Sequence, residues 1–301
     1  MGDVKASHIA DFLNLELIGD DISIYKALAL DTLEPDSIVF SKSKSIIIKE
    51  SCLVLVPFDF EAKESMFSYI KVQNPRLAFA KVVQNFFVDK VIYDIDNTST
   101  IGDNCYIAKE VKISKYCIIG NNVSIGRGTV INNHVVIGDN TVIGENCYIK
   151  SGSVIGEDGF GFDFEDDGRP IRIPHLGKVV LGNRVEIGAK NTIAKATLGV
   201  TKIEDNVKID DQVHIAHNCS IGKNTIITAC AEISGSVKIG QKCWIAPNVS
   251  IIQKVSIGDN VTIGIGAVVT KDIEKNKKIM GLESLELRPL LKVKKRIEYG
   301  K

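Results

Sequence analysis

The sequence predicts a mostly β protein: a left-handed parallel β-helix of hexapeptide repeats, with a small N-terminal α/β domain and a short C-terminal helical tail. Three observations lead to this fold class. An Ile recurs at every sixth residue through most of the 301-residue chain, the position four residues after each Ile holds a small side chain, and the first 98 residues lack the repeat. The composition agrees, because 45% of the residues are hydrophobic but only 6% are aromatic.

The repeat runs in three blocks, from Ile101 to Ile155, from Leu181 to Ile193 and from Ile203 to Val269, and comprises 25 hexads. Neither the helical period nor the two-residue alternation of strands produces a period of six, whereas a prism of short strands with a corner after each hexad does. Three hexads close one triangular coil. The chain should therefore build about eight coils, stacked at roughly the 4.8 Å spacing of neighbouring strands.

The residues between successive Ile positions fit tight corners. Gly follows many of the Ile residues, as in Ile119-Gly120, and both Gly and Asn adopt corner conformations that other residues adopt only at a cost. Five of the seven cysteines occupy the small inward position, which predicts buried thiols that fill corners and have no redox or metal role. These are Cys105, Cys117, Cys147, Cys219 and Cys243.

Residues 1–98 should form a small α/β domain. Residues 9–13 are expected to form a short amphipathic helix, residues 37–40 and 52–56 strands, and residues 77–83 a helix that begins at Asn74-Pro75. The β-helix then takes residues 99–270 and the helical tail residues 271–301. A loop over 157–180 interrupts the repeat with Asp158, Gly159, Phe160, Gly161 and Phe162, which suggests a flap that covers a ligand.

Charge and cysteine spacing exclude several classes of function. Lys and Arg number 37, as do Asp and Glu, so the net charge is zero and gives no bulk attraction to nucleic acid or to a membrane surface. The N-terminus does not resemble a signal peptide, and no apolar run reaches the ~18 residues of a membrane span. The seven cysteines lack CxxC spacing. We therefore expect a cytoplasmic protein without a permanently bound metal or cofactor.

The candidate catalytic residue is His217, in the segment Val213-His214-Ile215-Ala216-His217-Asn218. It lies two residues after an Ile, outside both inward positions, and can face a cleft. One coil further on is Gly235, whose backbone N–H could donate to a developing oxyanion with no side chain in the way. One hexad earlier lies Asp211, and an Asp near a His can hold its tautomer or raise its basicity.

At this point the chain resembles the UDP-3-O-acylglucosamine N-acyltransferases of lipid A and lipopolysaccharide biosynthesis. The resemblance covers nearly the whole chain. The residues that carry it are Ala10-Asp11, Gly19-Asp20, Val72-Gln73-Asn74-Pro75, Gly159-Phe160-Gly161-Phe162, Ile173-Pro174, Val185-Glu186-Ile187-Gly188-Ala189, Ile215-Ala216-His217-Asn218 and Gly235-Ser236-Val237-Lys238-Ile239-Gly240.

This resemblance implies a cytoplasmic homotrimer with active sites between subunits, His217 as general base and the Gly235 N–H as oxyanion donor. The reaction it implies is acyl transfer from a thioester, carried by acyl-carrier-protein phosphopantetheine or by CoA, to the amine of a nucleotide-linked amino sugar. Asp211 is expected to assist His217. The residues expected to contact substrates are Phe40, Asp158, Gly159, Phe160, Gly161, Phe162, His214, Asn218 and Lys254.

Four differences from the family pattern keep other functions open. Ser41-Lys42-Ser43-Lys44 replaces Asn-Pro-Lys-Tyr after Phe40, and Ile193-Ala194-Lys195 replaces Ile-Asp-Arg. Lys254 and Asp211 stand where the family has a second His and an Asn, and the tail is shorter. One alternative is a CoA-dependent N-acyltransferase that acts on a UDP- or dTDP-amino sugar for a surface polysaccharide. A second is a non-catalytic trimeric binding scaffold, and a third is a zinc hydratase.

Overall fold

The computed structural model describes residues 3–62 and 66–281, which form two compact units that divide between Val91 and Ile92. The expected boundary at residue 98 therefore lies a few residues too late, because Ile95 already pairs with Ile113 of the second unit. In this described part of the chain, none of the helices has the length and apolar character needed to cross a membrane.

The N-terminal unit is a five-stranded sheet with two helices. Its sheet has the order β2-β7-β6-β5-β4, and β1 pairs separately with β3. The elements are β1 (Val4–Lys5), α1 (Ala6–Leu13), β2 (Leu17–Ile18), β3 (Ser23–Ile24), β4 (Lys26–Ala27), the 3₁₀ turn η1 (Leu30–Thr32), β5 (Ser37–Phe40), β6 (Leu53–Pro57), β7 (Ser68–Val72) and α2 (Pro75–Phe86).

The helices and strands expected in this unit are all present. Helix α2 begins as its sequence predicts: Pro75 occupies its first turn, and the Asn74 side chain caps it by accepting a hydrogen bond from the Leu77 N–H at 3.2 Å. One core packs between the helices and the sheet around Ile9, Leu55 and Val82, and a second core surrounds Phe60.

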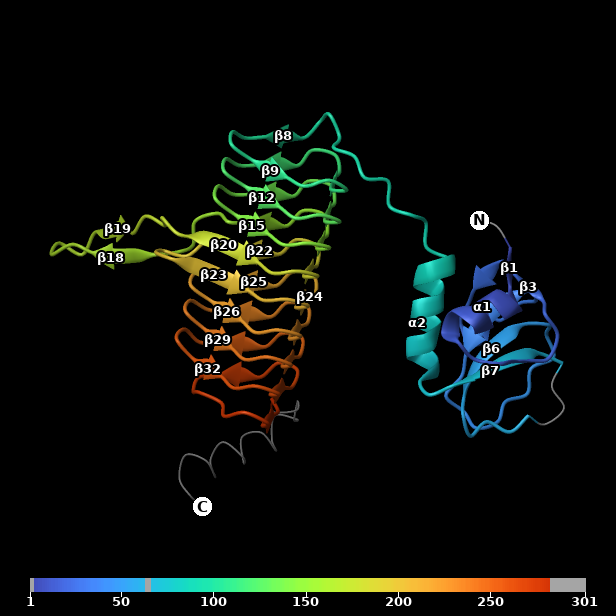
Figure 1. Cartoon of the computed structure of the whole chain (residues 1–301). Helices are drawn as coiled ribbons and strands as arrows, with labels where there is room; N and C mark the ends of the chain where they lie inside the picture. Colours follow the sequence, from blue (N-terminus) through green and yellow to red (C-terminus); the bar gives the residue numbers. More distant parts are fainter. Residues whose placement is uncertain (1–2, 63–65, 282–301) are drawn as a thin grey trace, which may run out of the picture. The chain divides into compact units, whose positions relative to one another are not determined.

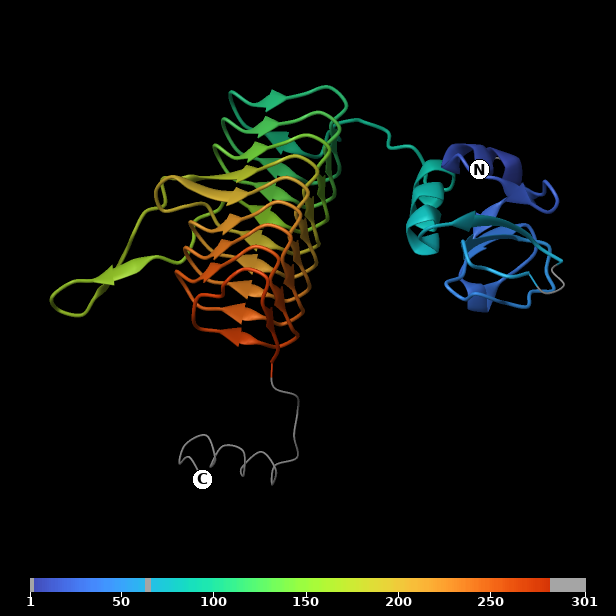
Figure 2. The same cartoon turned by 60° about the horizontal axis from the view of Figure 1, so that its bottom comes forward.

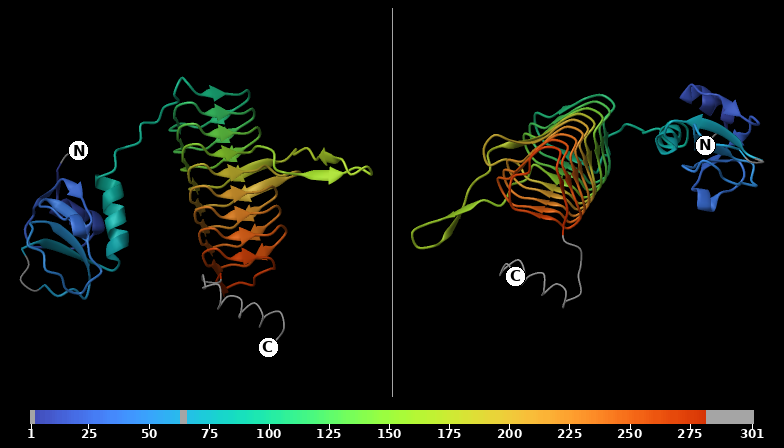
Figure 3. Two further views of the ribbon diagram at one scale, coloured as in Figure 1. Left: turned by 180° about the vertical axis from the view of Figure 1, so that it is seen from behind. Right: turned by 90° about the horizontal axis from the view of Figure 1, so that it is seen from below.

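The second unit is a column of three parallel sheets with nine, nine and eight strands, so the expected β-helix is confirmed (Figure 1). Figure 2 shows the strands stacked as successive rungs, and the view along the column in Figure 3 shows its triangular section. Consecutive strands of the chain lie on consecutive faces. Each Ile is therefore in register with the Ile of the next coil, as Ile215 is with Ile193 and Ile233.

The three faces are numbered in the cyclic order in which the chain passes over them, starting from the face of β10. The first face holds β10 (Lys112–Ile113), β13 (Val130–Ile131), β16 (Tyr148–Ile149), β21 (Glu186–Ile187), β24 (Lys208–Ile209), β27 (Ile226–Ile227), β30 (Trp244–Ile245), β33 (Thr262–Ile263) and β35 (Lys278–Ile279). The second holds β8 (Thr100–Ile101), β11 (Ile118–Ile119), β14 (Val136–Ile137), β17 (Val154–Ile155), β22 (Thr192–Ile193), β25 (His214–Ile215), β28 (Glu232–Ile233), β31 (Ser250–Ile251) and β34 (Val268–Val269). The third holds β9 (Tyr106–Ile107), β12 (Ser124–Ile125), β15 (Val142–Ile143), β20 (Lys178–Leu181), β23 (Val200–Ile203), β26 (Ser220–Ile221), β29 (Lys238–Ile239) and β32 (Ser256–Ile257).

The stacked Ile side chains fill the column, and the corners close around them. The residue three places after each Ile repeatedly has a positive φ, as at Asn122, Asn140 and Asn224, where Asn tolerates the left-handed conformation. The Gly that directly follows an Ile is needed for another reason. A Cβ on Gly120 would lie 2.8 Å from the backbone N of Asp139 in the next coil, so the coils could not stack as closely.

The cysteines at the inward corner position are fillers, as expected. Cys117, Cys147, Cys219 and Cys243 are buried and Cys105 is half-buried. Their thiols donate to backbone carbonyls of the next coil, as from Cys117 Sγ to the Asn132 oxygen at 3.0 Å. Burial raises the pKa of the Cys219 thiol to about 11, so at neutral pH it stays protonated and unreactive.

The C-terminal boundary of the column differs from the expected residue 270. Strand β35 pairs with β33, so the repeat continues to Ile279. The sequence pattern weakens there because Lys271 to Lys277 contains no Ile at the expected spacing, although Ile273 still bridges to Ile257. The expected helical tail otherwise lies outside the described residues.

Candidate active site

His217 lies on the edge of the column between the second and third faces, just after β25. Two insertions interrupt the hexads on this same edge. The first is the flap, residues 156–177, whose hairpin of β18 (Phe162–Phe164) and β19 (Pro170–Arg172) projects from the column (Figure 1). The second is a bulge at residues 194–200, where ten residues instead of six separate Ile193 from Ile203. The fold therefore brings flap, bulge and His217 to one edge, which we call the base edge.

Asn218 fixes the imidazole of His217. Its Oδ1 lies 3.0 Å from His217 Nδ1 and also accepts the Thr197 N–H at 3.0 Å. Its Nδ2 donates to the Leu198 carbonyl at 2.9 Å, which fixes the amide orientation. Because Oδ1 can only accept, His217 Nδ1 carries the proton and the neutral ring keeps its lone pair on Nε2. This tautomer leaves Nε2 able to take a proton from a substrate.

Gly235 lies one coil beyond His217, as the sequence spacing predicts. The Ser236 N–H donates to the His217 carbonyl at 2.9 Å, and a Cβ built on Gly235 would lie 2.8 Å from His217 Nε2. Any larger residue would therefore press on the nitrogen that is free to accept a proton. Within the described residues, the Gly235 N–H has no hydrogen-bond acceptor, so it remains able to donate to a ligand.

The flap closes over His217 through its glycines and a buried histidine. A Cβ built on Gly159 would lie 3.0 Å from His175 Nε2 and 3.3 Å from His217 Cβ, so the flap backbone passes close to both histidines. His175 is only 4% exposed, and its ring centre lies 5.4 Å from that of His217 at an interplanar angle of 75°. Sequence reasoning assigned His175 no role. Its place directly after Pro174 at the end of the flap was the available signal.

An ion pair ties the flap to the bulge. Lys195 Nζ lies 2.8 Å from Asp158 Oδ1, and the Lys195 N–H donates to the Glu157 carbonyl at 2.9 Å. Hydrogen bonding to Lys195 is the main reason why the pKa of the Asp158 carboxyl lies below its usual value. Asp158 is therefore engaged within the protein.

Two aromatic residues of the flap pair with each other. Phe160 is 87% exposed, and its ring centre lies 4.8 Å from that of Phe162, over which the Arg172 guanidinium sits at 5.0 Å. Gly161 packs beside His175, where its added Cβ would lie 3.0 Å from the ring. The exposed aromatic surface of the flap is thus available to a ligand or to another chain.

Asp211 does not contact His217 within this chain. It lies on the edge between the first and second faces, where its Oδ1 accepts from Lys150 Nζ at 2.6 Å and from the Ala189 N–H at 2.7 Å. The hydrogen bond from Lys150 is the main reason why the Asp211 pKa is lowered. Asp211 and His217 are one hexad apart, and one hexad in sequence is one face of the prism in space. Asn218, which we expected to bind substrate, provides the orienting contact instead.

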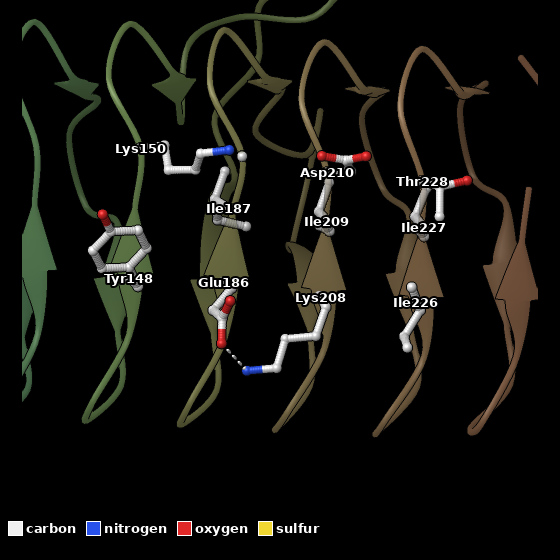
Figure 4. Close-up of a pocket in the computed structure, with 11 residues that line it drawn as sticks. Tyr148, Lys150, Glu186, Ile187, Lys208, Ile209, Asp210, Ile226, Ile227 and Thr228 are labelled. Atoms are coloured by element: carbon white, nitrogen blue, oxygen red, sulfur yellow. Dashed lines mark hydrogen bonds and ion pairs between the residues drawn. The ribbon is translucent and has the colours of Figure 1, made fainter. Parts of the chain in front are cut away.

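A cavity of about 290 Å³ lies on the first face beside this ion pair (Figure 4). Its side chains come from β16, β21, β24 and β27. Charged groups line it, including Lys150, the ion-paired Glu186 and Lys208, and Asp210. Tyr148, Ile187, Gly188, Ile209, Ile226, Ile227 and Thr228 complete the lining.

The other expected contact residues have partners other than His217. His214 points outward from β25, with its Nε2 3.9 Å from Glu232 Oε1. Lys254 is exposed at the corner one coil beyond Ser236, and its N–H donates to the Gly235 carbonyl at 2.9 Å. Phe40 lies in the N-terminal unit, half-buried, with its ring centre 5.1 Å from that of Phe79. Across residues 3–62 and 66–281, no three His, Cys, Asp or Glu side chains are arranged to hold a metal ion.

Comparison with known proteins agrees with the repeat. The family model described as bacterial transferase hexapeptide (six repeats) matches residues 98–133, 122–157, 201–235 and 236–271. The UDP-3-O-acylglucosamine N-acyltransferase of Campylobacter lari is 43% identical over 254 residues, which cover 79% of this chain and 80% of that protein.

Other relatives align over shorter segments. The UDP-3-O-acylglucosamine N-acyltransferase of Chlorobium chlorochromatii is 54% identical over 82 residues, or 27% of this chain, and the matched segment spans only 23% of that relative. Among solved structures, the UDP-N-acetylglucosamine acyltransferase of Francisella novicida superposes with a TM-score of 0.58 and 28% identity, covering 66% of this chain and 73% of that one.

Proposed function

Because this chain belongs to the UDP-3-O-acylglucosamine N-acyltransferase family, we propose that it transfers an acyl group from a thioester to the amine of a UDP-linked amino sugar. The observation that carries this proposal is the pairing of His217 and Gly235. A basic nitrogen with a fixed lone pair and a free backbone N–H lie one coil apart on the base edge.

In the proposed reaction His217 is the general base. The amine, once it is uncharged, attacks the thioester carbonyl carbon and forms a C–N bond, while His217 Nε2 takes the proton that the nitrogen sheds. The tautomer held by Asn218 supports this role, because it presents the unprotonated nitrogen on the side of Gly235. The protonated imidazole then returns the proton to the departing sulfur as the C–S bond breaks, so that an amide and a free thiol are the products.

Gly235 is the proposed oxyanion donor. The carbonyl oxygen of the thioester becomes negatively charged in the tetrahedral intermediate, and a preorganised backbone N–H stabilises that charge without any reorganisation. The lack of a side chain at Gly235 leaves room for the acyl carbon between this N–H and the base.

Lysine and flap residues are proposed to bind the two substrates. The flap aromatics Phe160 and Phe162 would cover the acyl donor or the sugar, with Gly159 and Gly161 shaping its base. Lys254 and His214 would contact anionic groups, and Phe40 would stack on the nucleotide base. Asp158 would act indirectly, because its carboxylate already binds Lys195.

The active enzyme is proposed to be a homotrimer. One chain leaves His217 and Asp211 on different edges, so a contact between them requires a second copy that brings its first-face cavity to the base edge. In that arrangement Asp211, Lys150 and the side chains of Figure 4 would complete the site of a neighbouring subunit.

The acyl donor and the cellular location are proposed from membership of the family. The thioester would be carried on acyl-carrier-protein phosphopantetheine or on CoA, the reaction would take place in the cytoplasm, and no permanently bound cofactor would take part. Lys254, which replaces the family's second histidine, could bind an anionic phosphate of either carrier.

A thiol-release assay tests the proposal. Purified protein is offered 3-hydroxyacyl-acyl-carrier-protein or the matching acyl-CoA, each with UDP-3-O-acylglucosamine or with a UDP- or dTDP-amino-deoxy sugar. We expect stoichiometric free thiol and amide with the first acceptor. Turnover only with acyl-CoA and a deoxy sugar would assign polysaccharide decoration instead. Binding of the nucleotide sugar without thiol release would identify a non-catalytic scaffold and refute the enzyme.

A further inference from the structure

His175 is a buried histidine for which the proposed reaction has no use. It lies at the C-terminal end of the flap, is 4% exposed, and directs Nδ1 to the Ile173 carbonyl at 3.1 Å. Because that carbonyl can only accept, Nδ1 carries the proton, and a neutral ring has its lone pair on Nε2. This Nε2 is fully buried and has no hydrogen-bond partner among the described residues.

Leaving a buried polar atom unpaired destabilises a protein, so a ring that only filled space here would be better replaced by an apolar one. The surroundings of His175 indicate what the ring provides. One side packs against the backbone of Gly159 and Gly161, and the other meets the His217 ring in an edge-to-face contact. Edge-to-face pairs have a preferred angle and so resist rotation of either ring.

The His217 ring therefore has two supports. Asn218 holds Nδ1 in the ring plane through a hydrogen bond, and His175 limits rotation of the plane itself. Thr197 of the bulge connects Asn218 to the His175 segment. The Thr197 N–H donates to Asn218 Oδ1, and the Thr197 carbonyl accepts the N–H of Leu176, the residue after His175.

We propose that His175 is a positioning residue that holds the plane of the His217 imidazole in line with Gly235 for proton transfer. It does so through its ring rather than through its hydrogen bond. This inference rests on the proposed function of His217 as base. His175 is buried beside the flap backbone at Gly159, so in this proposal it acts through His217 alone.

Three substitutions separate the ring from the hydrogen bond. His175→Phe keeps an aromatic ring of similar shape and removes both nitrogens. His175→Gln keeps a side-chain donor near the Ile173 carbonyl and removes the ring, and His175→Ala removes both. His134→Gln is the matched control, because His134 also stacks on an aromatic ring, that of Tyr116 at 5.3 Å, but is exposed on a regular corner.

We expect His175→Phe to retain kcat within about threefold, while His175→Gln and His175→Ala lower kcat by about 10- to 100-fold, the range for small misplacement of a catalytic group. KM for both substrates should change by less than about twofold, and His134→Gln should match the native enzyme. Active His175→Gln with inactive His175→Phe would overturn the proposal, as would a rise in KM at constant kcat.

Nitrogen NMR of ¹⁵N-histidine-labelled protein provides a readout that does not require turnover. In the native protein and in His175→Phe, His217 should show one tautomer, protonated at Nδ1; in His175→Gln it should show an average of both. An unchanged His217 spectrum in His175→Gln would refute the positioning role even if no thiol release is found. Absence of thiol release from native protein together with the expected spectra would instead refute the proposed function and leave the positioning of His217 supported. If His175→Ala does not fold, the comparison of His175→Phe with His175→Gln still tests whether the ring of His175 positions His217.

Discussion

Several regular corners of the column form a hydrogen bond that the corner holding His217 lacks. At these corners, an Asp or Asn side chain one coil on accepts the backbone N–H of the residue two places after the Ile, as from Asn121 to Asp139 Oδ1 at 2.7 Å and from Gln241 to Asp259 Oδ1 at 2.9 Å. After His217 the same position is Gly235, which has no side chain, and the residue one coil beyond Gly235 is Gln253. The candidate active site thus lies at a corner where no side chain of the next coil accepts this N–H.

This difference separates coils rather than whole edges, because Asn121 and Asp139 lie on the base edge as well. On the edge between the first and second faces, Asp211 belongs to the ladder, because it accepts the Ala189 N–H as Asp139 accepts that of Asn121. Near the His217 coil of the base edge, the flap and the bulge interrupt the ladder and enclose His217. Substitutions at the interrupted corner should thus affect turnover, whereas matching substitutions at regular corners should affect stability at most.

The largest effect is expected for His217→Ala. Removing the general base should lower kcat by about 10²- to 10⁴-fold, because proton transfer in the transition state contributes that much. Thiol release with saturating substrates measures the loss. His134→Ala, at an exposed regular corner, is the control and should leave kcat unchanged. Activity of His217→Ala close to the native level would place the base elsewhere.

Gly235→Ala should come next, with a loss of about 10²- to 10³-fold in kcat, the range for a disturbed oxyanion site. The new Cβ would lie 2.8 Å from His217 Nε2 and occupy the space of the tetrahedral intermediate. Gly235 does not have a positive φ, so the backbone tolerates Ala.

The reciprocal control is Ala229→Gly, because Ala229 holds the same position relative to Ile227 as Gly235 does to Ile233. This variant should keep full activity. Equal losses in both variants, with equal drops in melting temperature, would mean that the Gly235 substitution acts through the fold.

The pattern of the sequence predicts the column because a six-residue period allows few structures. The same period predicts that Gly235 lies one coil beyond His217, and the structure agrees. The role of Asn218 could not be derived this way, because its partners Thr197 and Leu198 belong to an insertion outside the repeat. The ten-residue gap between Ile193 and Ile203 signalled an insertion directly before the His217 coil, but not which way its backbone groups point.

The six-residue period could not predict the contact of His175 with His217 either. It lies in the flap, where no repeat constrains the path of the chain, and it meets His217 only because both insertions emerge from one edge. Asp211 shows the reverse error: a spacing of one hexad suggested proximity to His217, although in a triangular prism that spacing separates two edges.

Asn218→Ala should lower kcat by about 10- to 100-fold, the usual loss when the hydrogen-bond partner of a functional histidine is removed. Without the Oδ1 acceptor, the His217 ring can place its proton on Nε2, which then cannot act as base. Asn218→Asp keeps this oxygen and should recover most of the activity. Asn224→Ala is the control, because Asn224 has a similar φ of 60° at a regular corner and contacts no catalytic ring. If Asn224→Ala loses as much turnover, the effect of Asn218 is on corner conformation alone.

The smallest effect is expected for Lys195→Met, which removes the ion pair between flap and bulge. Lys195 lowers the pKa of the folded-state Asp158 carboxyl below its unfolded value of about 3.9, so the pair stabilises the protein above that pH, and the stabilisation is lost as the pH falls through the folded-state pKa. Since the Asp158 side chain is 40% exposed, the contribution should stay below about 1 kcal/mol. Urea midpoints should therefore differ slightly between native protein and variant at pH 7 and pH 5, and converge below about pH 4.

Lys202→Met, which removes an ion pair with Glu204 on the regular strand β23, provides the comparison. If Lys195→Met lowers turnover no more than Lys202→Met does, the ion pair stabilises the base edge without orienting it; a selective loss of turnover would add Lys195 to the groups that hold the flap over His217.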